Sequence, residues 1–176
     1  MRRKVNTEPI GNHRAIMDCR AIVDALAAAD ITHVLWLPDS EMGALEELLD
    51  GHASVRLVRV CREGEAMAIA AGLTVGGARP AVVIQSTGFF EAGDALRNVV
   101  HDCGLSLLLL IGYRGYSQHP EPERRPDSAG RLLEPTLAAW QIPYEILEEE
   151  TEATVIPRAA RAVQAGEGTR AILLPE

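Results

Sequence analysis

The amino-acid sequence predicts a three-layer α/β/α fold around a mainly parallel sheet of about six strands. First, segments with apolar residues at helical spacing alternate with short apolar runs along the chain. Second, these runs lack the polar and apolar alternation of half-exposed strands, which is typical of strands buried on both faces of a parallel sheet. Third, 47% of the 176 residues are hydrophobic, enough for one sizeable core. We therefore expect residues 1–176 to form a single domain.

Each predicted element follows from a local signal. The first helix carries Ile16, Ile22, Val23 and Leu26 at helical spacing, and the next apolar run, HVLWLP, ends at a proline. The alternation then repeats, with Gly88 marking a turn after the third strand. The predicted helices span 15–29, 41–49, 63–75, 91–100, 132–140 and 152–165, and the predicted strands span 33–38, 55–60, 80–85, 105–112, 144–147 and 170–175.

The segment 116–130, YSQHPEPERRPDSAG, is a long polar stretch between predicted elements. Long polar segments of this kind are either solvated loops or flaps over an active site. Its proline and charge content agrees with both interpretations, so both remain open.

Composition excludes several classes of function. The net charge is −8 and the basic residues are scattered, so binding of nucleic acid is not expected. The basic start, MRRKVNTEPIGNHRA, precedes no apolar signal segment, and no apolar run approaches the roughly 20 residues of a membrane span. We therefore expect a cytoplasmic protein. Cys19, Cys61 and Cys103 are widely spaced among apolar residues, which favours reduced core thiols over disulfides or a zinc site.

Polar side chains follow four of the predicted strands. In parallel α/β sheets, ligands bind beyond the carboxyl ends of the strands. These strand ends lack the glycine spacing of a Walker loop or of a Rossmann fingerprint, which excludes two common nucleotide sites. The residues at the four ends are Asp39 with Ser40, Glu63, Ser86 with Thr87, and Arg114.

Glu63 has two interpretations when it is considered alone. It lies in the first turn of a predicted helix, where a carboxylate is stabilised by the helix dipole and can cap free amides. It also lies at a strand end where a ligand site is expected. The nearby Glu65 is predicted to be a solvated helix residue.

Several stretches together resemble a known family. EGEAMAIAAG and ARPAVVIQSTG resemble the pyrimidine-binding domain of thiamine-diphosphate enzymes. The stretches LPDS, REGEAMAIAAG, QSTG, LLLLIGYRG and QIPYEIL, spread over about residues 33–147, resemble phosphonopyruvate decarboxylases and the α subunits of sulfopyruvate decarboxylases. The resemblance implies the thiamine-diphosphate-binding fold and a carboxy-lyase that acts on a short anionic 2-oxo acid.

The resemblance also implies residue roles. Glu63, nine residues before Gly72, would contact the cofactor's aminopyrimidine ring at N1′ and act as the catalytic proton relay. The cofactor-binding turn would comprise Ser86, Thr87, Gly88 and Phe89, although Phe89, Phe90 and Glu91 depart from the family's usual Leu-Gly-Asn. The substrate would be bound by Asp39, Ser40, Arg114 and His119, with Arg124 and Arg125 as further candidates for binding its anion.

Some of these residues also have purely structural interpretations. For Asp39 and Ser40 the alternative role is that of a helix N-cap. For His119 the alternative is an ordinary exposed loop residue without a role in binding. The sequence alone leaves these alternatives open.

One half of the family's active site has no counterpart in the sequence. These enzymes hold the diphosphate through Mg²⁺ with a GDG motif that is followed by an Asn-Asn pair. No GDG occurs in this sequence, and the partly similar AGD at 92–94 is not followed by an Asn-Asn pair. We therefore expect a hetero-oligomer in which a β subunit supplies the Mg²⁺ ligands. The expected reaction converts sulfopyruvate to sulfoacetaldehyde and CO₂. The alternatives are a phosphonopyruvate decarboxylase subunit, another thiamine enzyme divided into subunits, and a noncatalytic pyrimidine-type binding domain.

Overall fold

The computed structural model describes residues 18–39, 42–147 and 151–176, apart from the side chains of residues 152 and 153. The strands are β1 (His33–Trp36), β2 (Arg56–Arg59), β3 (Pro80–Gln85), β4 (Leu108–Tyr113), β5 (Tyr144–Ile146) and β6 (Arg170–Pro175). The helices are α1 (Cys19–Ala28), α2 (Gly43–Leu49), α3 (Glu63–Val75), α4 (Ser86–Glu91), α5 (Gly93–Arg97), α6 (Ser128–Ala139) and α7 (Glu152–Gln164), with a π-helical turn at Asn98–Asp102 and a 3₁₀ turn at Pro122–Arg124.

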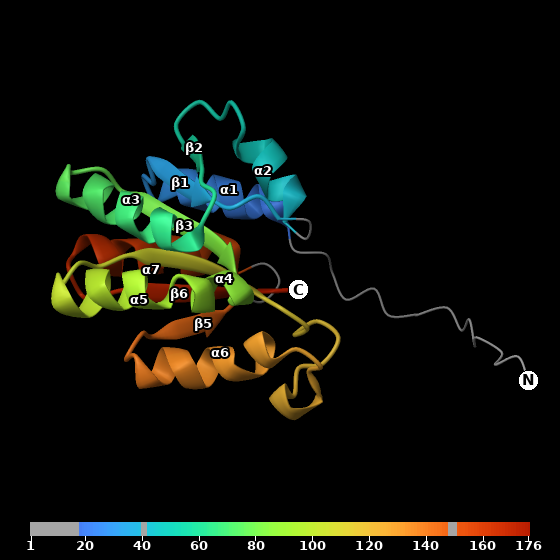
Figure 1. Ribbon diagram of the computed structural model, residues 1–176. Coiled ribbons are helices and arrows are strands. Elements are labelled where there is room, and N and C mark those ends of the chain that lie inside the picture. The colour runs from blue at the N-terminus through green and yellow to red at the C-terminus, as the bar shows by residue number, and fades with distance from the viewer. Residues whose placement is uncertain (1–17, 40–41, 148–150) are drawn as a thin grey trace, which may run out of the picture.

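The six strands form one sheet in the order β2-β1-β3-β4-β6-β5 (Figure 1). Every neighbouring pair is parallel. The predicted parallel sheet is therefore confirmed. All six carboxyl ends consequently lie at the same edge, which is the edge where a ligand site is expected.

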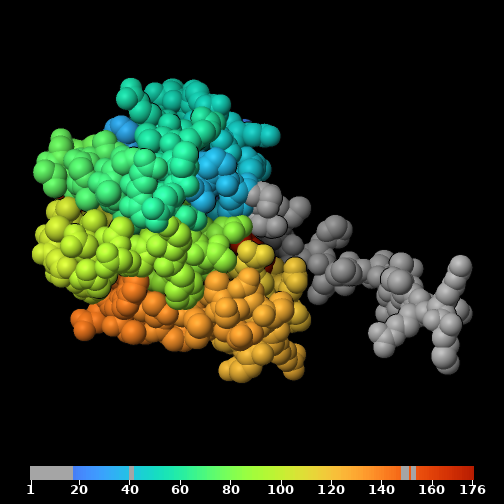
Figure 2. Space-filling view, in the orientation of Figure 1, coloured from blue at the N-terminus to red at the C-terminus, as the bar shows by residue number. Residues whose placement is uncertain are grey.

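Helices cover both faces of this sheet. Successive residues of each strand point to opposite faces, so apolar residues of one strand pack against helices on both sides. In β3, Ala81 and Val83 pack in one core with α1, α2 and α7. Val82 and Ile84 pack in a second core with α3, α4, α5 and α6. This second helical layer forms the face seen in Figure 2, where α3, α5 and α6 follow one another from green to orange. The three-layer fold is confirmed.

The region after β3 differs from its prediction. Instead of a turn at Gly88 and one helix over 91–100, the chain forms α4, α5 and the π-helical turn in succession. Gly88 and Gly93 weaken the helical signal in the sequence. Packing of buried residues such as Phe89 and Leu96 in the second core nevertheless holds these short helices in place.

The polar segment 116–130 contains less irregular loop than predicted. The 3₁₀ turn interrupts it, and α6 begins at Ser128, four residues before the predicted start. The Asp127 carboxylate caps α6 by accepting a hydrogen bond of 2.7 Å from the Ala129 N–H.

The N-terminus of α1 is capped similarly by Asp18, which accepts hydrogen bonds from the Arg20 and Ala21 N–H groups. Residues 15–17 of the first predicted helix lie outside the described residues.

The prediction of reduced core thiols is correct in part. All three cysteines are free, and the half-buried Cys19 packs against the first core, but Cys61 and Cys103 are exposed. Cys61 follows the end of β2 and Cys103 follows the π-helical turn, so both lie at the ends of elements rather than within the layers. Within the described ranges, no helix is long and apolar enough to cross a membrane.

Candidate active site

The first two site candidates are brought together at the carboxyl edge of the sheet. Glu63 opens α3 after β2, and Gly88 lies in α4 after β3. A Cβ atom added to Gly88 would lie 2.5 Å from Glu63 Oε1 and 2.6 Å from its Cγ. The half-buried Glu63 side chain therefore lies directly against the Gly88 backbone. Only glycine permits this close approach.

Other carboxylates bond the amides at the N-terminus of α3. The Gly64 N–H donates to Glu91 Oε2 at 3.0 Å, and the Cys61 N–H donates to Glu65 Oε2 at 3.2 Å. Glu65 is exposed, as predicted, but it also has this capping contact. The capping role considered for Glu63 is thus carried at these two amides by Glu65 and Glu91.

Ser86 links the ends of β3 and β4. Its hydroxyl donates to the Gly112 carbonyl at 2.6 Å and accepts the Arg114 N–H at 3.1 Å. The Ser86 side chain is fully buried, whereas Thr87 is exposed. If this turn contacts a cofactor, the structure favours Thr87 and the Gly88 backbone over the Ser86 hydroxyl.

Phe89 is directed into the second core. It is fully buried and packs against Trp140, with ring centroids 5.3 Å apart. The neighbouring Phe90 is 37% exposed. Phe90 rather than Phe89 is therefore the exposed ring of this turn, because the helical geometry of α4 turns the two rings to different sides.

Arg114 follows β4 and is held at its position by backbone contacts. A Cβ atom on Gly130 would collide with the Arg114 carbonyl, so the first turn of α6 approaches Arg114 closely. The guanidinium of Arg114 is half-exposed and lies 3.1 Å, through Nε, from Asp127 Oδ2. An anionic ligand at Arg114 would bind beside this carboxylate or displace it.

Arg125 is a structural residue. Its side chain is 1% exposed, and its guanidinium donates to the carbonyls of His119, Pro120 and Gly130. It also lies 4.3 Å from the centre of the Tyr113 ring. These contacts correct the expectation that Arg125 binds a substrate anion, because its donors are used to hold the loop. Arg124 is exposed.

A carboxylate completes this network beneath the loop. Glu134 of α6 bonds the hydroxyls of Tyr113 and Tyr144. Burial, and then the Glu134 bond, raise the pKa of Tyr113 above its ordinary value. The Glu134 bond, followed by burial, raises the pKa of Tyr144 to about 12. Both hydroxyls therefore stay protonated near neutral pH and serve as donors to Glu134.

The remaining predicted substrate residues are Asp39, Ser40 and His119. Asp39 Oδ1 accepts the Met42 N–H at 3.3 Å, which agrees with the local capping alternative. Ser40 lies outside the described residues. His119 is half-buried, and its carbonyl accepts the Arg125 bond. The substrate roles of Asp39, Ser40 and His119 stay predictions.

Glu176 is a further residue at the same edge. It directly follows β6, and a Cβ on Gly112 would collide with its carboxylate. Its side chain thus covers the end of β4 next to the Ser86 hydrogen bond. The rule that polar residues after parallel strands gather at one edge would have found Glu176 if it had been applied to the sixth strand.

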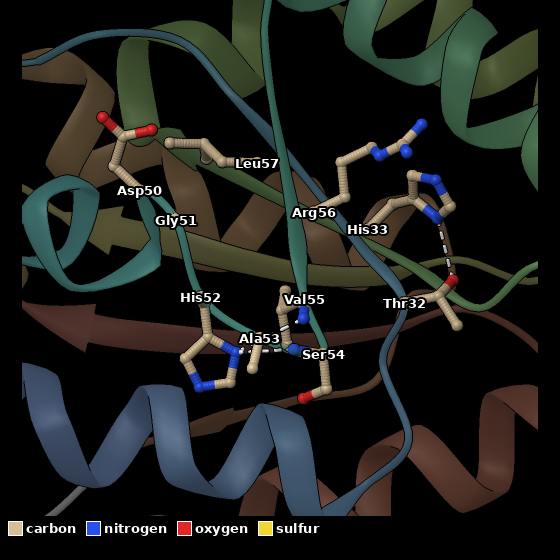
Figure 3. Close-up of a pocket in the computed structure, with 10 residues that line it drawn as sticks. All are labelled: Thr32, His33, Asp50, Gly51, His52, Ala53, Ser54, Val55, Arg56 and Leu57. Atoms are coloured by element: carbon tan, nitrogen blue, oxygen red, sulfur yellow. Dashed lines mark hydrogen bonds between the residues drawn. The ribbon is translucent and has the colours of Figure 1, made fainter.

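A shallow, open groove lies at the other end of the sheet (Figure 3). It has a volume of about 620 Å³ and lies around the amino ends of β1 and β2, with Thr32, His33 and His52 among its residues. The His52 Nδ1 accepts the N–H groups of Ser54 and Val55, so this ring stabilises the turn. The groove contains none of the predicted site residues, and the chemistry expected of Glu63 therefore lies elsewhere.

Comparison with known proteins identifies the family. Residues 19–127 match the model of the thiamine pyrophosphate enzyme, N-terminal TPP binding domain. The chain belongs to this family. The matched residues of this thiamine pyrophosphate enzyme domain include Glu63, Gly88 and Arg114, and the match ends at Asp127.

Relatives of this domain include two named decarboxylases. Sulfopyruvate decarboxylase subunit alpha of Methanocaldococcus jannaschii is 27% identical over 123 residues, covering 70% of this chain and 72% of that protein. Phosphonopyruvate decarboxylase of Streptomyces viridochromogenes is 24% identical over 132 residues, covering 74% of this chain and 33% of that protein. The chain thus spans about a third of the second relative.

A solved structure supports the fold. A thiamin diphosphate-dependent enzyme from Mycobacterium smegmatis superposes with a TM-score of 0.65 at 19% identity, over 89% of this chain and 30% of that one. At this identity the similarity concerns the fold alone. The predicted thiamine-diphosphate-binding fold is confirmed.

The residues at the sheet edge fit one part of the cofactor. The Glu63 carboxyl can bond a ring nitrogen, and the missing side chain of Gly88 leaves room for this carboxyl at the edge of the sheet. Metal-binding residues do not fit in the same way: within the described ranges, no three His, Cys, Asp or Glu side chains gather as a metal site. This chain therefore fits the aminopyrimidine part of thiamine diphosphate.

Proposed function

We propose that this chain is the pyrimidine-binding α subunit of a thiamine-diphosphate-dependent 2-oxo acid decarboxylase that converts sulfopyruvate to sulfoacetaldehyde and CO₂. The single observation that carries the proposal is the Glu63 carboxyl held against Gly88 at the carboxyl edge of the sheet. The names of the relatives, two of which are α subunits of sulfopyruvate decarboxylases, support the choice of substrate and the need for a partner.

Three residues of this edge have defined roles in the proposed mechanism. Thiamine diphosphate, when bound, supplies the nucleophilic carbon and the electron sink that decarboxylation of a 2-oxo acid requires. Glu63 holds and transfers a proton at N1′ of the aminopyrimidine ring. Gly88 fixes where the Glu63 carboxyl lies. Arg114 offers a guanidinium to the anionic end of the substrate.

The partner requirement is the direct test of this proposal. The purified chain with thiamine diphosphate and Mg²⁺ is expected to show no turnover of sulfopyruvate, because the diphosphate and Mg²⁺ ligands are expected on a β subunit. Adding a β subunit that carries the GDG and Asn-Asn motifs should restore decarboxylation, measured as CO₂ release. Rapid turnover by the chain alone would contradict the two-subunit proposal. Cofactor binding without turnover in the complex would favour the noncatalytic alternative.

Phosphonopyruvate is the second candidate substrate, supported by the relative that acts on it. Sulfonate and phosphonate groups both suit a guanidinium. Replacing Arg114 by Ala should lower kcat/KM about tenfold or more for the anionic substrate and much less for pyruvate, since charge-assisted bonds contribute about 1.5–3 kcal/mol. Steady-state kinetics of the complex on the three 2-oxo acids test this.

Arg56→Ala is the matched control for Arg114→Ala, because it removes an exposed arginine at the amino end of β2, away from this edge of the sheet. It should leave the ratio between the substrates unchanged. If Arg114→Ala lowers kcat/KM equally for sulfopyruvate and pyruvate, Arg114 has only a structural role.

A further inference from the structure

Glu91 bonds both chain neighbours of Glu63. Its Oε1 accepts from Arg62 Nη2 at 2.7 Å and from Nε at 3.1 Å. Its Oε2 accepts the Gly64 N–H at 3.0 Å. One carboxylate therefore bonds the side chain of the residue before Glu63 and the backbone N–H of the residue after it.

The same short helix contacts Glu63 from a second direction. Gly88 and Glu91 both belong to α4, and they lie one turn apart. Gly88 forms the surface against which the Glu63 side chain lies, and Glu91 accepts a hydrogen bond from the N–H of Gly64, the residue directly after Glu63. The position of Glu63 is thus determined jointly by packing against α4 and by a hydrogen bond from α4 to the neighbouring backbone.

The charge of Glu91 follows from its surroundings. The hydrogen bonds from Arg62, and then from the Gly64 N–H, hold the pKa of Glu91 below its ordinary value. Glu91 is therefore a charged carboxylate near neutral pH and acts as the acceptor in each of these bonds.

We propose that Glu91 is a positioning residue that holds Glu63 in the orientation needed to exchange a proton with the bound aminopyrimidine. This inference rests on the proposed function, because Glu63 has a proton to exchange only if the cofactor binds there. A surface ion pair with Arg62 would be the simpler interpretation, and such pairs contribute little to stability. That interpretation does not account for the bond to the Gly64 N–H, which fixes the backbone next to the residue expected to do the chemistry.

The test compares Glu91→Ala with a matched surface variant. Asp94→Ala removes an acid three residues further on, which is 92% exposed and pairs with Arg97. With the β subunit present, Glu91→Ala should lower kcat roughly tenfold or more, because a small displacement of a catalytic group is costly. Glu91→Asp should remain impaired, since its shorter side chain cannot reach both Arg62 and the Gly64 N–H. Asp94→Ala should retain the activity of the unchanged protein.

A double-variant cycle separates positioning from a general structural role. If Glu91 acts through Glu63, Glu91→Ala should change kcat by less than about twofold when Glu63 is already Gln. Equal losses from Glu91→Ala in both backgrounds would overturn the proposal. An unchanged kcat in Glu91→Ala itself would do the same.

Crystal structures of the variants test the inference without any activity. In Glu91→Ala the Glu63 carboxyl should leave its place against Gly88, and in Asp94→Ala it should stay there. Glu63 in an unchanged position in Glu91→Ala would contradict the positioning role. If the unchanged complex binds no thiamine diphosphate, the proposed function fails, whereas the crystal structures still decide whether Glu91 positions Glu63.

Discussion

Glu63→Gln is expected to lower kcat of the reconstituted decarboxylase by roughly 10²–10⁴, the range typical of lost acid–base catalysis. The amide has nearly the shape of the carboxyl, but it cannot accept and return a proton. Stability should change by at most about 1 kcal/mol, since Glu65 and Glu91 bond the Cys61 and Gly64 amides at this helix end. Steady-state kinetics and thermal unfolding of the variant measure the two effects.

Glu65→Gln is the matched control for this change. Glu65 lies two residues along the same helix turn, and its amide replacement can still accept the Cys61 N–H. Its kcat should equal that of the unchanged complex. If the two variants have the same activity, Glu63 is not the proton relay.

Gly88→Ala should impair activity far more than stability. The new methyl group would collide with Oε1 and Cγ of Glu63. These atoms are at the mobile end of a side chain, so the fold can relieve the collision by moving Glu63 away. Because a displacement of about 1 Å at a catalytic group can cost about 10² in rate, kcat should fall by about this factor while the unfolding temperature stays nearly constant.

Gly43→Ala provides the comparison for Gly88→Ala. Gly43 lies in α2 on the other face of the sheet, and a Cβ there meets nothing within 4 Å. This variant should keep full activity. If Gly88→Ala is also fully active, the close approach of Gly88 does not position Glu63.

Much of the fold could be predicted from local sequence patterns. Apolar runs without alternation, such as PAVVIQ, revealed strands that are buried on both faces. The location of Glu63 at a strand end followed from the same pattern, since in a parallel sheet the end of each strand marks the ligand edge.

The contacts around the site could not be predicted in this way, because they depend on how distant segments pack. Gly88 was interpreted as a turn, and only the packing of α4 on α3 shows that it makes room for Glu63. Glu91 bonds residues 27 and 29 positions away in the sequence. Arg125 lies in a polar segment, and the sequence therefore predicts that its side chain is exposed. In the structure this side chain is buried among carbonyl groups and aromatic rings.

The most direct measurement of the central claim is the rate of proton exchange at C2 of the thiazolium ring of bound thiamine diphosphate, with the β subunit present. This rate reports activation of the cofactor before any substrate binds. The account predicts slow exchange in Glu63→Gln and an unchanged rate in Glu65→Gln. Equally fast exchange in both variants would contradict the assignment of Glu63 as the proton relay and would favour a noncatalytic domain.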